Sequence, residues 1–133
     1  MSLEPGVQRT DEFTVEGRLV TDVGGTIGVS VLSTPGMIAM IEQNATILAL
    51  EHLPAGRATV GFEVCVKHVA GALEGARCAA HARLTEVLDG RKLRFAVEVT
   101  ELAPEGGEPR TIGVGTHERR VIDVAAHADS AGS

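Results

Sequence analysis

Apolar and polar residues recur with two different periods along the chain, and the change from one to the other divides it into elements. Residues 9–20 alternate apolar and polar positions, which predicts a strand with one buried face. The positions expected on that face are Phe13, Val15, Gly17 and Leu19. The glycine-rich stretch that follows lacks the lysine and the spacing of a phosphate-binding loop, so we interpret it as a connecting loop.

A long helix is predicted next, over 35–53. Ser33 or Thr34 can cap its start, with Pro35 at the first helical position, and the proline and glycine at 54–56 end it. Its apolar positions form more than one stripe, so we expect the helix to be covered on most sides. They include Met37, Ile38, Ile41, Ala45, Ile47, Leu48, Ala49 and Leu50.

Four stretches with strand character follow the helix, at 58–69, 75–88, 91–102 and 110–124. In the first of them, one face is expected to carry Val60, Phe62, Val64, Val66 and His68. The pair Asp89-Gly90 predicts a hairpin turn. Consecutive strands favour an antiparallel sheet and the α+β class. Because a curved sheet covers only one side of the helix, a second subunit is expected to cover the other.

Length and composition predict a single domain spanning 1–133, with about 1–10 and 125–133 as disordered tails. The net charge of −6, without a basic stripe carrying aromatic residues, argues against binding to nucleic acid. The sequence has no apolar run of membrane-spanning length and no apolar secretory segment at its start, so we expect a cytoplasmic location and no membrane partner. Cys65 and Cys78 are expected to be small buried residues in strands rather than a disulfide or a zinc site.

Three polar features lie at positions where the apolar pattern predicts packed, apolar residues. Glu42 shares a helix face with apolar residues, although it is equally well explained as a partly exposed residue at the helix edge. His68 ends the apolar face of its strand, where a histidine with satisfied hydrogen bonds in the core is the simpler explanation. The polar run 115–120 fits a solvent-facing strand end about as well as a ligand site.

Taken together, these features suggest chemistry. A threonine at a helix start, a glutamate eight residues later and a histidine on the following strand can carry out acyl transfer. The carboxylate can act as nucleophile or base, the histidine can move protons near neutral pH, and backbone N–H groups can polarise a carbonyl.

The layout also resembles the hot-dog fold, and within it the fluoroacetyl-CoA thioesterase group. The resemblance rests on three strings in the expected order: STPGMIAMIE at 33–42, VGFEVCVKH at 60–68 and GTHER at 115–119. It implies an antiparallel sheet wrapped around one long central helix. It also implies an acyl-CoA thioesterase that needs no metal and no cofactor beyond the coenzyme A of its substrate.

The resemblance assigns roles to five residues. Thr34, Glu42 and His68 take the catalytic positions. Gly61 takes the position whose backbone lies against the thioester, and Arg119 takes that of an arginine near the active site. A homodimer or a dimer of dimers, with sites where two subunits meet, is implied as well.

One departure from the group bears on specificity. The phenylalanine lid of the fluoroacetyl-specific enzyme corresponds to Gly28 here, and residues 21–32 contain no aromatic residue. We therefore do not extend fluoroacetyl specificity to this chain. Two alternative functions stay open, namely another hot-dog acyl-thioester enzyme of the hydratase type and a non-catalytic acyl-CoA-binding domain.

Overall fold

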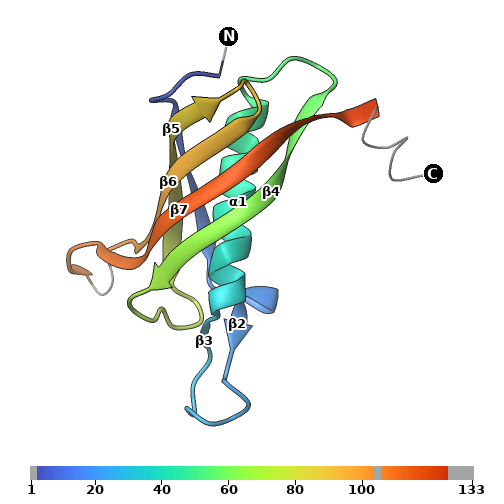
Figure 1. Cartoon of the computed structure of the whole chain (residues 1–133). Helices are drawn as coiled ribbons and strands as arrows, with labels where there is room; N and C mark the ends of the chain where they lie inside the picture. The colour runs from blue at the N-terminus through green and yellow to red at the C-terminus, as the bar shows by residue number, and fades with distance from the viewer. Residues whose placement is uncertain (1–2, 104–105, 126–133) are drawn as a thin grey trace.

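The structure is a computed structural model that describes residues 3–103 and 106–125. Its elements in chain order are β1 (Gln8–Thr14), a 3-10 turn η1 (Gly17–Leu19), β2 (Val20–Thr21), β3 (Val31–Leu32), α1 (Thr34–Leu50), β4 (Arg57–His68), β5 (Arg77–Leu88), β6 (Lys92–Glu101) and β7 (Arg110–Asp123) (Figure 1). The expected disordered segment after residue 125 lies outside the described residues. At the other end β1 begins at Gln8, inside the segment expected to be disordered.

Five strands form one antiparallel sheet in the order β1-β5-β6-β7-β4, and α1 lies along one face of it (Figure 1). β2 and β3 form a separate two-stranded ribbon. The turn between β5 and β6 has positive φ at both Asp89 and Gly90, as the predicted hairpin requires. One long helix against a sheet of mostly consecutive strands confirms the α+β class.

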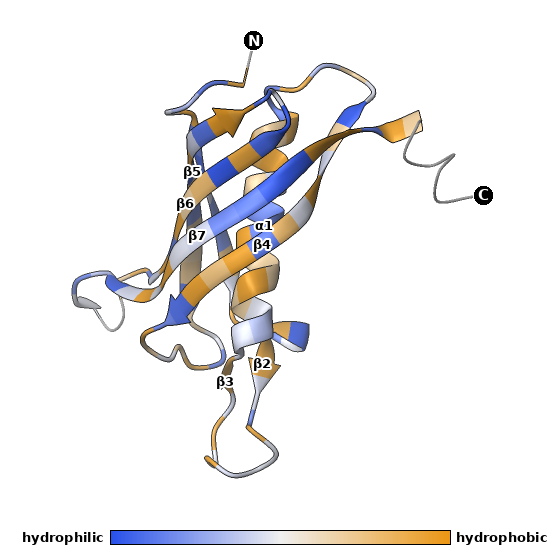
Figure 2. Cartoon of the chain, in the orientation of Figure 1, coloured by the Kyte–Doolittle hydropathy of each residue, from blue (hydrophilic) through white to orange (hydrophobic). Residues whose placement is uncertain are grey.

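The hydrophobic core lies between α1 and the sheet. Buried helix residues recur every three or four positions, as expected for one face of a helix. They are Met37, Ile41, Ala45 and Leu48, and they belong to one cluster with the sheet residues Leu84, Phe95, Val97 and Val99. Figure 2 shows this apolar character along α1.

The start of α1 separates the roles of two neighbouring hydroxyl groups. Ser33 is the N-cap, and its Oγ accepts a hydrogen bond of 2.9 Å from the backbone N–H of Gly36. Thr34 is the first helical residue, followed by Pro35. The Thr34 hydroxyl is therefore not used for capping. The helix ends at Leu50, three residues before the expected end.

The N-terminal strand is shorter than its alternation predicted. β1 ends at Thr14, and only Val15 continues its buried face, with no exposed surface. Gly17 then has a φ of +59°, a left-handed conformation that glycine adopts at little cost, and the chain turns through η1. Leu19 consequently lies in this turn and not on a strand.

The expected alternation along β4 is interrupted. A β-bulge shifts its register against β7 between Gly61 and Glu63, so that Phe62 is the extra residue. The bulge reverses which residues face α1, so Gly61 faces the helix and Val60 does not. Val60 and Phe62 are 38% and 59% exposed. The prediction that both share a buried face with Val64 was wrong for this reason.

The two cysteines are free, as expected, but only one is buried. Cys78 lies in the core, where burial raises the pKa of its thiol to about 11. Cys65 is exposed on β4, which corrects the prediction that both fill the interior. Within the described residues, no helix is long and apolar enough to cross a membrane.

Candidate active site

Thr34 and His68 meet at the start of α1. The Thr34 Oγ1 atom lies 2.9 Å from Nδ1 of His68, the last residue of β4. The helix start fixes the threonine, and the strand end brings the histidine to it. This contact joins two of the three residues expected to be catalytic.

An open cavity of about 410 Å³ lies at this pair. Its lining comprises Val31, Leu32, Thr34, His68, Val69, Ala70 and Gly71. The second ring nitrogen of His68, Nε2, is buried and has no hydrogen-bond partner among the described residues. The ring thus contacts Thr34 through one nitrogen, and the other has no hydrogen-bond partner among the described residues.

Glu42 lies in the middle of α1 and faces Gly61 of β4. A Cβ atom placed on Gly61 would come within 2.6 Å of Glu42 Oε2, so only glycine leaves room for the carboxylate in this position. The Glu42 side chain is 43% exposed. This exposure agrees with the partly exposed helix residue considered from the sequence, and the carboxylate in addition lies against a strand that has no side chain at that point.

Arg119 of β7 is the cation that faces Glu42. Its Nη1 lies 3.8 Å from Glu42 Oε2, and its side chain is only 6% exposed. Nε donates to Thr59 Oγ1 at 2.7 Å, and Nη2 donates to the Thr59 carbonyl at 3.1 Å. Burial lowers the pKa of Arg119 and the Glu42 carboxylate raises it, but a guanidinium remains protonated throughout the accessible pH range.

The middle of the polar run on β7 is buried, which corrects the interpretation of the run as a solvent-facing strand end, although Thr116 is exposed. His117, Glu118 and Arg119 are 1%, 7% and 5% exposed. His117 and Arg119 alternate toward α1, whereas Glu118 lies on the other face and forms ion pairs with Arg94 and Arg120. The strand therefore carries charge on both faces, and each charged group has a partner.

The predicted site residues form two clusters within one chain. Thr34 and His68 form the first, and Glu42, Gly61 and Arg119 form the second. Thr34 and Glu42 are eight residues apart on α1, which corresponds to about 12 Å along the helix axis. The cavity beside the first cluster does not include Glu42 in its lining.

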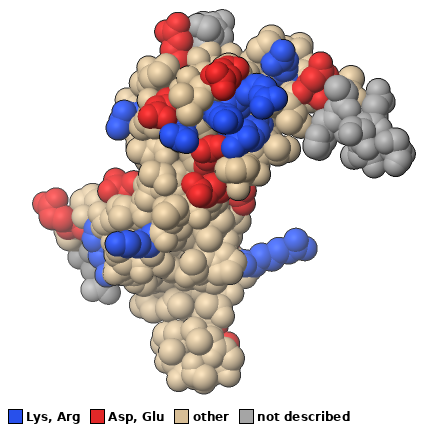
Figure 3. Space-filling view, in the orientation of Figure 1, with Lys and Arg blue, Asp and Glu red and all other residues tan. Residues whose placement is uncertain are grey.

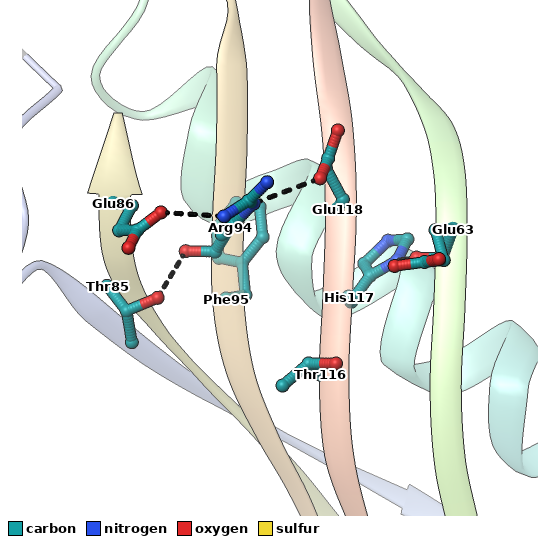
Figure 4. Close-up of a pocket in the computed structure, with 8 residues that line it drawn as sticks. All are labelled: Glu63, Thr85, Glu86, Arg94, Phe95, Thr116, His117 and Glu118. Carbon is teal, nitrogen blue, oxygen red and sulfur yellow. Dashed lines mark hydrogen bonds and ion pairs between the residues drawn. The ribbon is translucent and has the colours of Figure 1, made fainter. Parts of the chain in front are cut away.

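A second cavity, of about 320 Å³, opens on the face of the sheet opposite α1 (Figure 4). Figure 4 shows Arg94 between Glu86 and Glu118, and their contacts are 3.0 and 3.1 Å. The arginine is therefore already paired with carboxylates from the two neighbouring strands. No group of three or more His, Cys, Asp or Glu among the described residues is arranged to hold a metal ion.

Thr59 and His117 belong to the second cluster, although the sequence did not single them out as site residues. Thr59 looks like one more alternating strand residue, and only the register with β7 shows that it binds Arg119. His117 carried a usable signal, since a histidine two residues before an arginine shares its face of a strand.

The comparison with protein families identifies the chain. The model of the family described as fluoroacetyl-CoA-specific thioesterase matches residues 15–125. The chain belongs to this family. The match includes both clusters.

Relatives agree with this assignment. The fluoroacetyl-CoA thioesterase of Streptantibioticus cattleyicolor is 32% identical over 92 residues, which are 69% of this chain and 61% of that protein. The chain thus matches less than two thirds of that relative's length.

Solved structures confirm the hot-dog fold. A hot-dog-like protein from Thermanaerovibrio acidaminovorans superposes with a TM-score of 0.81 at 18% identity, covering 96% of this chain and 89% of that one. A variant of the fluoroacetyl-CoA-specific thioesterase FlK, in complex with fluoroacetate and CoA, gives a TM-score of 0.78 at 25% identity, covering 94% and 99%.

Proposed function

We propose that this chain is an acyl-CoA thioesterase, which hydrolyses a thioester to the free acid and CoA, with Thr34, Glu42 and His68 as its catalytic residues. The observation that carries the proposal is the pair of clusters. A hydroxyl and an imidazole are joined at an open cavity, and a carboxylate is held between a glycine and a buried arginine. Membership of a thioesterase family and the CoA bound in a solved relative support the same reaction.

Each cluster supplies a different part of the reaction. Hydrolysis needs a nucleophile at the carbonyl carbon, donors for the developing oxyanion and a proton for the departing thiolate. Glu42 supplies the nucleophile or activates water, and His68 moves the protons with its ring oriented by Thr34. The glycine at position 61 lets backbone and substrate approach closely.

We further propose that a second copy of the chain brings the two clusters together. β4 is an edge strand of the sheet, and its free side carries exposed apolar residues beside the bulge. Figure 2 shows apolar positions along this edge. In antiparallel pairing of two β4 strands about a two-fold axis, residues that lie opposite each other must face the same side.

One register of this pairing joins the two clusters. In this register Cys65 lies opposite Cys65 of the partner subunit. Phe62, the extra residue of the bulge, has no residue opposite it, so His68 lies opposite Gly61 of the partner subunit. His68 and Gly61 both face the α1 side. This register places Thr34 and His68 of one subunit beside Glu42 and Gly61 of the other, which completes each site across the two-fold axis.

Release of CoA from a panel of acyl-CoAs, followed with DTNB, tests the activity. We expect steady release of thiol, whereas a hydratase-type enzyme or a binding domain releases none. A free, exposed thiol such as Cys65 is expected to react with DTNB as well, so Cys65→Ser is the appropriate protein for the assay. Absence of turnover across acetyl, branched and aromatic acyl-CoAs would refute the proposed function.

The assembly has its own test. We expect a dimer or a dimer of dimers by light scattering at micromolar concentration. Residues directly opposite in an antiparallel pair have Cα atoms about 4.5–5.5 Å apart, within the range that a disulfide spans. Mild oxidation should therefore cross-link the wild type through Cys65, and Cys65→Ser should stay uncrosslinked. A monomer in solution would contradict the composite site.

We expect the substrate specificity of this chain to differ from that of the fluoroacetyl-specific enzyme. Gly28, at the position of the lid phenylalanine, has a φ of +72° in the exposed loop between β2 and β3. Without a packed ring there, we expect no strong preference for fluoroacetyl-CoA over acetyl-CoA and tolerance of larger acyl groups. A kcat/KM ratio above about 1,000, or about 4 kcal/mol, would contradict this.

A cytoplasmic location is also part of the proposal. Free thiols persist in that compartment, and the two cysteines of the chain are free.

A further inference from the structure

His117 is a buried histidine in the second cluster to which no catalytic step has been assigned. Its side chain is 1% exposed and lies between β4 and β6 on the α1 side of the sheet. Nδ1 lies 2.8 Å from the carbonyl oxygen of Glu63, and Nε2 lies 3.2 Å from Nη1 of Arg119. The ring also stacks on Phe95, with centroids 6.1 Å apart.

These two contacts define the protonation of the ring. A carbonyl oxygen only accepts hydrogen bonds, so Nδ1 carries the proton that it donates to Glu63. A guanidinium only donates, so Nε2 is unprotonated and accepts from Arg119. The ring is therefore neutral, in agreement with the lowering of the pKa of His117 by burial and by the charge of Arg119.

A neutral acceptor has a consequence for the charge of Arg119. A carboxylate at position 117 would fix the guanidinium equally well, but it would also neutralise it. The imidazole and the two oxygens of Thr59 hold the guanidinium in place without adding negative charge. The full positive charge then acts on Glu42, whose Oε2 is 3.8 Å from the same Nη1 that donates to His117.

We propose that His117 is a positioning residue of the thioesterase site: its neutral ring, protonated on Nδ1, directs the Nη1 group of Arg119 toward Glu42. The Glu63 carbonyl, next to the bulge in β4, accepts the hydrogen bond from Nδ1 and so leaves Nε2 as the acceptor for Arg119. The inference rests on the proposed function, since it assigns His117 a role in placing the carboxylate that reacts.

Three variants at one position separate this role from a structural one. In His117→Gln, the amide oxygen can reach the place of Nε2 and accept from Arg119, while the contact to Glu63 is lost. In His117→Asn, the shorter amide can donate to Glu63 but cannot reach Arg119. His117→Phe fills the space and offers neither contact.

The measurement is kcat and KM on the best acyl-CoA of the panel. We expect His117→Gln to keep kcat within about threefold of the wild type, and His117→Asn and His117→Phe to lose at least about tenfold in kcat with little change in KM. Equal losses in the Gln and Asn variants, better retention by Asn, or full activity of the Phe variant would each overturn the inference. If the Phe variant does not fold, the comparison of the Gln and Asn variants still separates a positioning role of His117 from a structural one.

A second measurement does not depend on turnover. Nitrogen-15 NMR of the histidine rings at neutral pH should show His117 protonated on Nδ1 and unprotonated on Nε2, with the signal assigned by its absence in His117→Gln. A ring protonated on Nε2, or on both nitrogens, would overturn the inference. An inactive wild type with the expected tautomer would refute the proposed thioesterase function and leave the geometry of His117 intact.

Discussion

The two clusters along α1 are built in opposite ways. Thr34 and His68, at the start of the helix, share one side-chain hydrogen bond beside an open cavity. Arg119, facing the middle of the helix, is nearly buried and has contacts to Thr59, His117 and Glu42. Under the proposed mechanism, the groups that reach a substrate are held by few contacts, whereas the cation facing the carboxylate is fixed by burial and several acceptors.

The surface around the clusters shows a similar division. Charged side chains of both signs gather over the upper part of the sheet in Figure 3, while the lower projection carries few. That projection contains the loop between β2 and β3, with exposed Val23, Ile27 and Val29. The first cluster thus borders an apolar region, which suits an acyl group better than it suits an ion.

Among variants in the two clusters, loss of the Glu42 carboxylate should reduce the rate of hydrolysis most. Glu42→Gln keeps the size of the side chain and removes its charge. We expect hydrolysis to fall by at least about tenfold, or about 1.4 kcal/mol of barrier. Steady-state kinetics measure the loss, and thermal unfolding is the control. A variant that lost stability but kept its specific activity would show that Glu42 is structural.

The first cluster can be tested with two adjacent residues. Thr34→Val removes the hydroxyl that contacts His68 and leaves the Ser33 cap intact, so activity should fall about tenfold with little change in stability. Ser33→Ala removes the cap and should cost about 1 kcal/mol of stability with smaller effect on turnover.

Urea unfolding measures the stability of Thr34→Val and Ser33→Ala, and steady-state kinetics measures their activity. If Thr34→Val lost the stability and Ser33→Ala the activity, the roles of the two hydroxyl groups would have to be exchanged.

A glycine pair tests the second cluster. In Gly61→Ala the new Cβ would come within 2.6 Å of Glu42 Oε2, at the end of a flexible side chain that can move aside. We expect a severalfold loss of kcat with nearly unchanged stability. In Gly115→Ala the Cβ would come within 2.1 Å of the Cys65 carbonyl oxygen, which is backbone and cannot move aside.

Gly115→Ala should therefore unfold at clearly lower temperature than Gly61→Ala, although both remove a glycine from neighbouring strands. Differential scanning fluorimetry measures the two unfolding temperatures. Equal destabilisation in the two variants would mean that Gly61 is needed by the bulge itself.

The sequence predicted α1 and the meander from β5 to β7, because periodicity and turn residues are local signals. It failed at β4, where one extra residue in the bulge reverses the faces of Val60 and Gly61. Alternation continues through VGFEVCV as if unbroken, so the sequence does not indicate the bulge. It also failed at 117–119, since burial of charge depends on partners from two other strands, β4 and β6, and from α1.

The smallest expected effect is a pH dependence of the free energy of unfolding, caused by the ring of His117. Because its folded-state pKa is lowered below the ordinary 6.5, the unfolded chain binds a proton that the folded chain does not as pH falls below that value. Stability should therefore decrease on acidification from about pH 6.5, and the decrease should stop once the folded ring is protonated as well.

The charged groups that act on this ring are Arg119, which disfavours protonation, and Glu42 across from it on α1, which favours it; the Glu63 carbonyl also favours it. Urea unfolding of the wild type and His117→Gln between about pH 7 and pH 5 isolates this contribution, because the other titrating groups are common to both. The free energy of unfolding should fall more steeply in the wild type. Parallel slopes would mean that the ring has the same pKa in the folded and the unfolded chain and is not kept neutral by its surroundings. A shallower slope in the wild type would mean that the folded ring holds its proton, and a protonated ring cannot accept the hydrogen bond from Arg119 that orients it toward Glu42.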